Sequence, residues 1–285
     1  MFGGEMVKHW RRQERLVYIT QYLIQHPGET INLNTFAATL GVAKSSISED
    51  LALVKSALGR KGLGWVETEL GAAGGVCYWP GRGLEEARAL AWELCEKAAD
   101  IRRFIPGGFL YLTDIVFSPQ LMSQVGEIFA ARFQPRRPDY VVTVETKGIP
   151  LALMTARSLG IPLVTARREH KVTEGSAVSM SYVSGSSQRL QTMSLARRAL
   201  PAGAKVVLMD DFMKAGGTAR GLQELLGEFK AQIVGIGVLM EMAEPPQKLV
   251  QDYLSLLVFE GVDEKRREVR VRPSDWLVGE KGGGS

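Results

Sequence analysis

The feature that most constrains the fold of this chain is an apolar strand that runs directly into two acids and a glycine-bearing turn. Residues 206–209 have the sequence of a buried parallel strand, Asp210 and Asp211 follow it, and a helical pattern begins near Ala219. In open α/β sheets, ligands bind at such strand-to-helix turns. The turn amides favour phosphate, and a pair of carboxylates suits the hydroxyls of a sugar such as ribose. The segment therefore predicts a sugar-phosphate site in a parallel α/β sheet.

This segment resembles the phosphoribosyl pyrophosphate (PRPP) motif of type I phosphoribosyltransferases. The resemblance implies that the acid pair holds the ribose hydroxyls and that the turn holds the 5′-phosphate. The effector-binding residues expected here are Asp210, Asp211, Phe212, Met213, Lys214, Ala215, Gly216, Gly217 and Thr218. The enzymes usually have small hydroxyl residues where this chain has Lys214 and Ala215, which argues against turnover more than against binding. An ordinary Asp-Asp-Gly turn in an α/β sheet is the alternative interpretation.

A second strand-to-turn unit lies earlier in the chain. Residues 140–144 have the sequence of a buried strand, which ends in Glu145, Thr146, Lys147 and Gly148 before another helix. This unit resembles the pyrophosphate loop of the same fold, and the resemblance implies that Thr146, Lys147 and Gly148 hold the diphosphate. Because PRPP carries phosphate groups at both ends, two such loops on neighbouring strands would bind the whole molecule.

Further candidate contacts come from a basic cluster after a third strand, at residues 161–166. Arg167, Arg168 and Lys171 would attract a multiply charged anion, and a solvated loop is the alternative. The Gly-, Ser- and Thr-rich segment 172–192 corresponds in the enzymes to a mobile loop over the site. The candidate contacts in this segment are Gly185, Ser186 and Ser187.

Two aromatic residues follow the Pro106-Gly107-Gly108 turn and are candidates to stack on a base. These are Phe109 and Tyr111, and a place in a core strand is the alternative for both.

The composition permits two domains and excludes several classes of protein. The chain has 285 residues, no apolar run of membrane-spanning length, and no apolar stretch typical of a signal peptide at its start. We therefore expect a cytoplasmic protein with no membrane partner. The two cysteines form no Cys-x-x-Cys pair and the three histidines are scattered, so we expect no metal ion bound by the protein itself.

The first 60 residues have the pattern of a helix followed by a helix-turn-helix. A helical pattern runs from about residue 8 to 25, and a short helix near Asn34 meets a turn at Gly41. A further helix then places Ile47, Leu51, Val54 and Leu58 on one buried face. Two packed helices with a polar exterior are the alternative to a DNA-reading motif.

A predicted hairpin follows, with strands near 64–70 and 75–79 around a small glycine-rich loop. Helix, helix-turn-helix and hairpin together are the order of a winged helix. The net charge of the chain is +4, and residues 1–80 carry eight basic and seven acidic side chains, so clustering must provide DNA binding. The candidate DNA contacts are Arg11, Arg12, Arg15, Lys44, Ser45, Ser46, Ser48, Lys55, Ala72 and Gly74.

These elements predict three segments. Residues 1–80 form an α+β winged-helix DNA-binding domain, residues 81–278 an α/β phosphoribosyltransferase-like, Rossmann-like effector domain with a parallel sheet, and residues 279–285 a flexible tail. A small hood over the site is expected from residues 253–258 and 267–272.

A winged helix ahead of a PRPP-binding domain resembles the purine operon repressor family of Gram-positive bacteria. The segments that carry the resemblance are residues 44–51, 71–76, 171–176, 182–187 and 210–218. One departure is Phe109, where the family tends to have tyrosine, so a hydroxyl contact would be missing while stacking survives. The resemblance implies a homodimeric repressor of purine biosynthesis genes that binds double-stranded operator DNA.

The same resemblance implies two small-molecule effectors. PRPP, with Mg²⁺ as a candidate companion ion, would be the inducer, and ppGpp would compete for the same pocket as co-repressor. Two alternatives remain: an active purine phosphoribosyltransferase fused to a DNA-binding domain, and a nucleotide sensor whose N-terminal domain binds protein.

Overall fold

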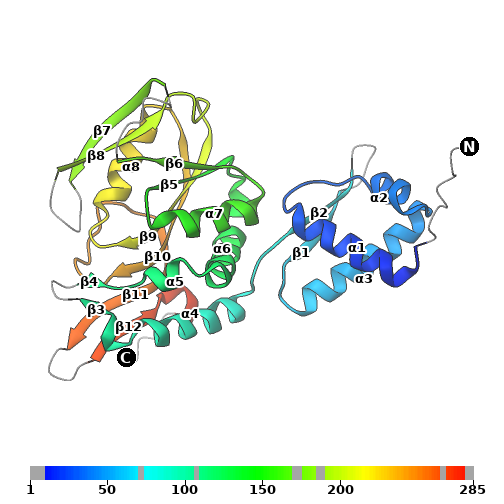
Figure 1. The fold of residues 1–285 in the computed structure, drawn as a ribbon, viewed down its shortest axis with the longest axis horizontal. Helices are drawn as coiled ribbons and strands as arrows, with labels where there is room; N and C mark the ends of the chain where they lie inside the picture. The colour runs from blue at the N-terminus through cyan, green and yellow to red at the C-terminus, as the bar shows by residue number, and fades with distance from the viewer. Residues whose placement is uncertain are drawn as a thin grey trace, which may run out of the picture. The chain divides into compact units, whose positions relative to one another are not determined.

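A computed structural model describes residues 10–69, 74–105, 109–168, 175–183, 190–263 and 268–279. The chain divides into two compact units. The N-terminal unit is Met1–Arg82 with Ser158–Gly160, and the C-terminal unit is Gly83–Arg157 with Ile161–Ser285. Their architectures confirm the predicted fold class: a three-helix domain with a strand hairpin, followed by a mostly parallel α/β sheet (Figure 1).

The N-terminal unit packs three helices and a two-stranded hairpin around one core. Its elements are α1 (Arg12–Gln25), α2 (Leu33–Leu40), α3 (Lys44–Arg60), β1 (Trp65–Thr68) and β2 (Val76–Trp79). The apolar stripe predicted on the third helix, Ile47, Leu51, Val54 and Leu58, is buried in this core. The buried face of α3 therefore leaves most of its polar residues on the outside, as a helix-turn-helix requires, and Asp50 is the buried exception.

The second helix begins near Asn34, as predicted, whereas the first begins later than predicted. The N-cap of α2 is Asn32, whose side chain accepts a hydrogen bond from the amide of Asn34, the second residue of the helix. The first helix begins at Arg12, and residues 1–9 lie outside the described part of the chain. Gly41 ends α2 with a φ of 64°, which is the left-handed geometry that glycine adopts at helix ends.

The C-terminal unit is built on a six-stranded sheet with the order β12-β11-β10-β9-β5-β6. The strands are β5 (Tyr140–Val144), β6 (Leu163–Ala166), β9 (Lys205–Met213), β10 (Gln232–Met242), β11 (Tyr253–Asp263) and β12 (Glu268–Pro273). All neighbours are parallel except β11 and β12. The prediction that residues 253–258 and 267–272 form a hood is therefore wrong, because both segments extend the main sheet.

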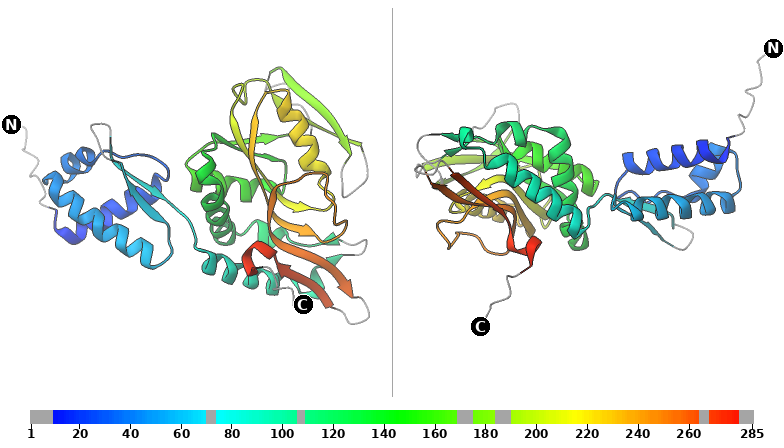
Figure 2. Two further views of the ribbon diagram at one scale, coloured as in Figure 1. Left: turned by 180° about the vertical axis from the view of Figure 1, so that it is seen from behind. Right: turned by 90° about the horizontal axis from the view of Figure 1, so that it is seen from below.

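Helices cover both faces of this sheet (Figure 2). On one face, α8 (Gly217–Gly227) packs over Val206 and Leu208 together with an antiparallel ribbon of β7 (Ala177–Val183) and β8 (Leu190–Ala196). On the other face lie α6 (Pro119–Phe133) and α7 (Gly148–Leu159), and a methyl group on Gly237 would contact both Met209 and Phe129 of α6. Alternate residues of β9 thus point to opposite layers, as in other two-sided parallel sheets.

The remaining elements lie beside β12 and around the α6 layer. They are α4 (Leu84–Ala98), η1 (Ile101–Arg103), β3 (Phe104–Ile105), β4 (Phe109–Leu110), α5 (Thr113–Val116), η2 (Gln134–Arg136) and α9 (Asp275–Val278). Helix α4 packs mainly against β12 and also touches β11, α6 and α9. The short strands β3 and β4 pair antiparallel, so the strand predicted after Pro106 is only two residues long.

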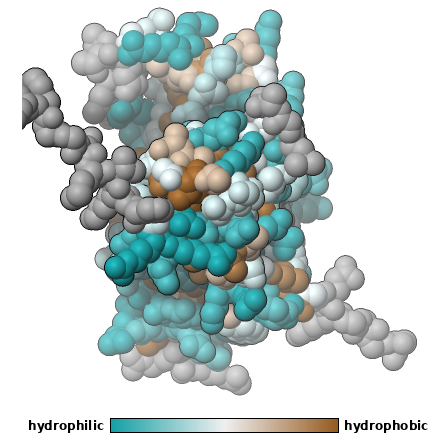
Figure 3. All heavy atoms as spheres, turned by 90° about the vertical axis from the view of Figure 1, so that its right-hand side faces the viewer, coloured by the Kyte–Doolittle hydropathy of each residue, from teal (hydrophilic) through white to brown (hydrophobic). Residues whose placement is uncertain are grey.

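The molecular surface is mainly polar on the face drawn in Figure 3, where hydrophobic residues form only small patches. None of the described helices is long and apolar enough to cross a bilayer.

Candidate functional site

A cavity of about 460 Å³ lies at the carboxyl ends of β5 and β9. Two loops predicted from separate parts of the sequence meet here, because β5 and β9 are parallel neighbours. The lining residues are Val144, Glu145, Thr146, Lys147, Gly148, Arg168, Asp210, Asp211, Phe212, Met213, Lys214, Ala215, Gly216, Gly217, Thr218, Ala219 and Val238. The structure thus brings together the predicted acid pair, both predicted loops and one arginine of the basic cluster.

The position of this cavity follows from the topology of the sheet. The chain leaves β5 through α7 toward β6, whereas it leaves β9 through α8 toward β10 on the other side. Since right-handed crossovers in opposite directions place their helices on opposite faces, the two loops diverge and leave a crevice between them.

The acid pair lies within strand β9 and not after its end. The strand continues to Met213, and Asp210 is paired in register with Val238 of β10, so the predicted strand end at Met209 is wrong. The amide of Asp211 donates a hydrogen bond to Asp210 Oδ1 at 2.9 Å. The loop proper is therefore limited to residues 214–216, directly before α8.

The electrostatics of the acid pair are unfavourable for two negative charges. Burial, followed by repulsion from Asp211, raises the pKa of Asp210 well above its ordinary value. Burial also raises the pKa of Asp211, and the positive charge of Lys147 partly opposes that rise. A ligand that donates hydroxyl hydrogens to these carboxylates would relieve their desolvation.

The turn after the acid pair has the geometry of an anion site. Gly216 has a φ of 83° at the N-cap of α8, and as a glycine it has no side chain with which to cap the first amides of that helix. The Ala215 carbonyl accepts a hydrogen bond from the Leu249 amide at 2.9 Å, which anchors the loop from its far side. The first amides at the positive end of an eleven-residue helix are suited to a phosphate group.

The loop after β5 combines a basic residue with a restrained acid. Lys147 is exposed at the cavity, whereas Glu145 is half-buried. Glu145 Oε1 accepts a hydrogen bond from the Arg168 amide at 2.7 Å, and its other oxygen lies 3.9 Å from the Arg167 guanidinium. These contacts compensate the carboxylate of Glu145, so the cavity retains the positive charges of Lys147 and Arg168.

Several predicted effector contacts do not line the cavity or lie outside the described residues. Arg167 is paired with Ser194 of β8 through both backbone groups and is not a lining residue. The backbone of Phe109 belongs to β4. Lys171, Gly185, Ser186 and Ser187 lie outside the described residues.

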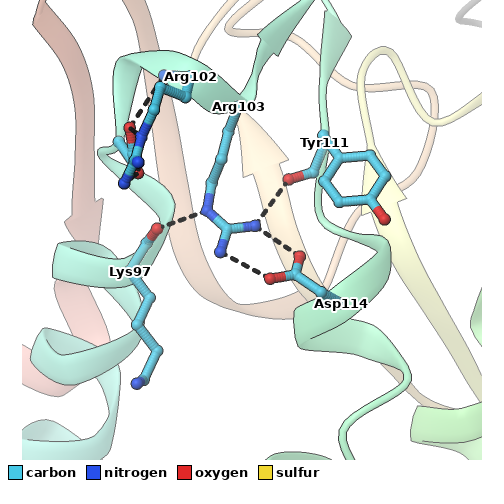
Figure 4. Close-up of polar contacts among 6 residues, drawn as sticks. Lys97, Arg102, Arg103, Tyr111 and Asp114 are labelled. Carbon is cyan, nitrogen blue, oxygen red and sulfur yellow. Dashed lines mark hydrogen bonds and ion pairs between the residues drawn. The ribbon is translucent and has the colours of Figure 1, made fainter.

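Tyr111 is 46% exposed, and its backbone is held by a clamp centred on Arg103 (Figure 4). Arg103 Nε donates to the Lys97 carbonyl at 2.7 Å, and one terminal nitrogen donates to the Tyr111 carbonyl at 3.2 Å. Both terminal nitrogens donate to the carboxylate of Asp114, at 2.5 and 2.7 Å. Figure 4 shows the Tyr111 ring pointing away from this network.

Three lining residues were not predicted: Val144, Ala219 and Val238. Val238 comes from β10, and only the register between β9 and β10 places it beside Asp210. A second hollow of about 450 Å³, at the edge formed by β10 to β12, was not predicted either. Its polar groups bond one another, since Tyr253 and Ser255 both donate to Glu241. Burial, together with the hydrogen bond to Glu241, raises the pKa of Tyr253.

The predicted DNA contacts divide into an exposed and an inward-facing group. On α3, Lys44, Ser45, Ser48 and Lys55 are exposed, and Ser46 is half-buried. The Ser48 hydroxyl donates to the carbonyl of Lys44 at 3.2 Å.

On α1, Arg11 is exposed, and the Arg12 side chain is 52% exposed. The Arg15 side chain is only 13% exposed and is bound to Asp50. The Arg15 guanidinium therefore binds groups inside the domain.

The hairpin carries the last two predicted DNA contacts. The Gly74 carbonyl accepts a hydrogen bond from the Asn32 side chain at 3.2 Å, and Ala72 lies outside the described residues. Glu67 accepts hydrogen bonds from the indole N–H groups of Trp65 and Trp79, both at 3.0 Å. The Glu67 carboxylate is therefore bound by two tryptophans of the same hairpin.

The two units of the chain match two different protein families. Residues 11–80 match the family described as "Bacterial purine repressor, N-terminal", and residues 113–271 match the phosphoribosyl transferase domain. The chain is 47% identical over 268 residues to the purine biosynthesis transcriptional repressor PurR of Bacillus subtilis, covering 94% of each chain. The chain belongs to the bacterial purine repressor family. A relative in Lactococcus lactis strain IL1403, 39% identical over 92% of this chain and 97% of its own, is named a transcriptional activator.

The C-terminal unit also has relatives among enzymes. Xanthine phosphoribosyltransferase of Geobacillus thermodenitrificans is 36% identical over 155 residues, which cover 53% of this chain and 80% of the enzyme. The solved structure of adenine phosphoribosyltransferase from Thermoanaerobacter pseudethanolicus matches 59% of this chain and 99% of its own with a TM-score of 0.51 at 21% identity. The phosphoribosyltransferase fold is therefore present, while the relatives that span the whole chain are named transcriptional regulators.

Proposed function

We propose that this protein is a DNA-binding repressor of purine biosynthesis genes whose C-terminal unit binds PRPP without consuming it. The observation that carries the proposal is the single cavity in which the acid pair, the α8 turn and the Lys147 loop meet. That cavity belongs to a chain whose first part matches a bacterial purine repressor. A regulator with such a cavity is suited to sense a phosphorylated sugar.

Each part of PRPP has a complementary part of the cavity. Asp210 and Asp211 would accept hydrogen bonds from the ribose hydroxyls, and the amides before α8 would hold the 5′-phosphate. Lys147 and Gly148 would hold the diphosphate, supported by the charge of Arg168. Mg²⁺ bound with PRPP would neutralise part of the diphosphate charge.

Release from DNA follows from linkage between two binding equilibria. PRPP weakens operator binding only by favouring a form of the protein that binds DNA less well, and couplings of about 1–3 kcal/mol are typical. An anionic guanine nucleotide such as ppGpp, placed in the same cavity, would exclude PRPP and so act as co-repressor. A homodimer would bind the two halves of an operator.

The main rival is an active purine phosphoribosyltransferase with a DNA-binding domain. It is supported by the identity to xanthine phosphoribosyltransferases over half of the chain. Against it stand the regulator names of the relatives that span the whole chain, together with Lys214 and Ala215 in the turn that lines the cavity.

Fluorescence anisotropy with a labelled duplex from the purine operon promoter of the source organism tests the proposal. We expect tight binding to this duplex, weaker binding to a random duplex of equal length, and release by PRPP with Mg²⁺. Asp211→Ala is expected to keep DNA binding and lose the PRPP response. Formation of a nucleotide from PRPP and xanthine would favour the enzyme, and equal affinity for both duplexes would remove the operator-binding function.

A further inference from the structure

The N-terminal unit contains a charged residue that is completely buried on its DNA-reading helix. Asp50 lies in α3, and its side chain is 1% exposed. Arg15 Nε donates to Asp50 Oδ2 at 2.8 Å, and Arg12 Nε donates to Asp50 Oδ1 at 3.2 Å. Because an uncompensated buried carboxylate is costly, these bonds fix the N-terminal turn of α1 against the middle of α3.

Arg12 and Arg15 differ in how much of each guanidinium is bound inside the domain. Arg15 is mostly buried and also donates to the Trp10 carbonyl at 3.3 Å, so its guanidinium is used inside the domain. The Arg12 side chain is 52% exposed and gives only Nε to Asp50. Its terminal nitrogen lies 3.9 Å from Glu49, a side chain that is itself 74% exposed and surrounded by solvent. Among the residues that the structure describes, the terminal nitrogens of Arg12 have no hydrogen-bond partner, so they can bind a group outside the protein.

We propose that Asp50 is a positioning residue for DNA binding, which holds Arg12 so that its outer nitrogens contact a backbone phosphate beside α3. The inference rests on the proposed DNA-binding function. A free arginine loses side-chain entropy when it binds a phosphate, whereas Arg12 is already restrained by one end of its planar guanidinium. Asp50 thus lowers the cost of a phosphate contact that it never touches.

Two neighbouring substitutions with the same charge change separate positioning from plain electrostatics. Asp50→Asn and Glu49→Gln each remove one negative charge from α3. Plain electrostatics predicts that both tighten DNA binding, since the domain becomes more positive. Positioning predicts that Glu49→Gln keeps or tightens binding, whereas Asp50→Asn weakens it by about tenfold, the scale of one charge-assisted hydrogen bond.

The salt dependence gives a readout that a merely structural role would not change. A lost phosphate contact lowers the slope of log affinity against log salt concentration by about 1. We expect this decrease for Asp50→Asn and for Arg12→Gln, and no further decrease in the double variant. Arg12→Lys retains the charge on a half-exposed residue but loses the planar fork. Positioning therefore predicts weaker DNA binding for this variant and plain electrostatics predicts unchanged binding, which separates the two even where Asp50→Asn fails to fold.

These measurements use the full-length chain and the promoter duplex. If the wild-type chain binds the duplex and Asp50→Asn keeps its affinity and salt slope, the positioning role is overturned and the proposed function stands, whatever the result for Arg12→Gln. If the wild-type chain shows no preference for the promoter duplex, the proposed function itself fails.

Discussion

A methyl group on Gly148 would lie 3.0 Å from Oδ1 of Asp210, on the neighbouring strand of the sheet. The same methyl group would also collide with the Thr143 hydroxyl, which is fully buried. Gly148, the first residue of α7, is therefore in close contact with Asp210. Any side chain at position 148 must displace Asp210 or Thr143. This contact couples the loop after β5 to the acid pair.

Gly148→Ala is expected to weaken PRPP binding by about tenfold or more. Overpacking of this kind costs about 1–3 kcal/mol, and each 1.4 kcal/mol corresponds to a factor of ten in affinity. Titration calorimetry with PRPP and Mg²⁺ measures the change. Gly227→Ala, at the C-terminal end of α8, is the control, because a methyl group there meets nothing within 4 Å. Equal affinities for the two variants would contradict the close contact between Gly148 and Asp210.

Asp210→Asn is expected to raise the thermal stability of the ligand-free protein near neutral pH. The folded protein holds the Asp210 proton more tightly than the unfolded chain, so stability falls as pH rises from the ordinary carboxyl pKa of 3.8 through the raised one. An asparagine removes this loss. The difference in Tm between variant and wild type should vanish below about pH 3.8, where Asp210 is protonated in both states.

Glu224→Gln serves as the control for that experiment, because Glu224 forms an exposed pair with Arg220 one turn earlier on α8. Its Tm should change little at any pH. A lower Tm for Asp210→Asn than for the wild type at neutral pH would show that the acid pair stabilises the fold instead of straining it.

The Arg103 clamp predicts a large difference between two adjacent arginines. Arg103→Met removes donors from the carbonyls of Lys97 and Tyr111 and from the carboxylate of Asp114, and should lower the free energy of unfolding by about 1–3 kcal/mol. Arg102→Met is the matched control. The Arg102 side chain is 86% exposed and binds Asp100, so its loss should change the free energy of unfolding much less than the loss of Arg103. Urea unfolding of both variants measures the difference.

The difference in unfolding free energy between Arg103→Met and the wild type should depend on pH. The Arg103 guanidinium lowers the pKa of Asp114, so the ion pair stabilises the fold above the ordinary carboxyl pKa and is lost as pH falls through the lowered one. Because Asp114 is half-exposed, solvent screens part of this effect. The gap between Arg103→Met and wild type should narrow in acid, and a gap that widened there would contradict the pairing.

Lys44→Glu is expected to abolish binding to the promoter duplex and leave PRPP binding unchanged. Lys44 is the exposed first residue of α3, so the reversed charge would repel a phosphate at the start of the DNA-reading helix. Lys61→Glu, at the exposed C-cap of the same helix, provides a control of equal charge change. Equal loss of DNA binding in both variants would mean that general charge, and not the start of α3, determines binding.

Local patterns in the sequence were sufficient for most of the fold. The apolar stripe from Ile47 to Leu58 fixed the buried face of α3, and the strands β5 and β9 carry the two loops of the cavity. The wrong hood prediction for residues 253–258 overlooked a pattern in the sequence. Residues 256–259 form an uninterrupted apolar run and are buried together with Ser255, which is typical of a strand covered on both faces.

The orientation of charged residues was harder to predict, because it depends on partners distant in the sequence. Arg15 and Asp50 are 35 residues apart, and nothing local to the arginine indicates that it turns inward. The spacing of α3 did contain a signal, since Asp50 lies three residues after Ile47 on the buried stripe. An acid on an apolar stripe requires a cation from another helix, and α1 supplies two.

The central claim is that the acid pair and the α8 turn bind PRPP and leave it intact. Calorimetry of PRPP with Mg²⁺ against the wild type and the Asp210→Ala/Asp211→Ala variant, followed by chromatography of the recovered ligand, tests it most directly. We predict saturable one-site binding to the wild type, at least tenfold weaker binding to the variant, and recovery of unchanged PRPP in the presence of xanthine. Equal binding by the two proteins, or conversion of PRPP to a nucleotide, would contradict the claim.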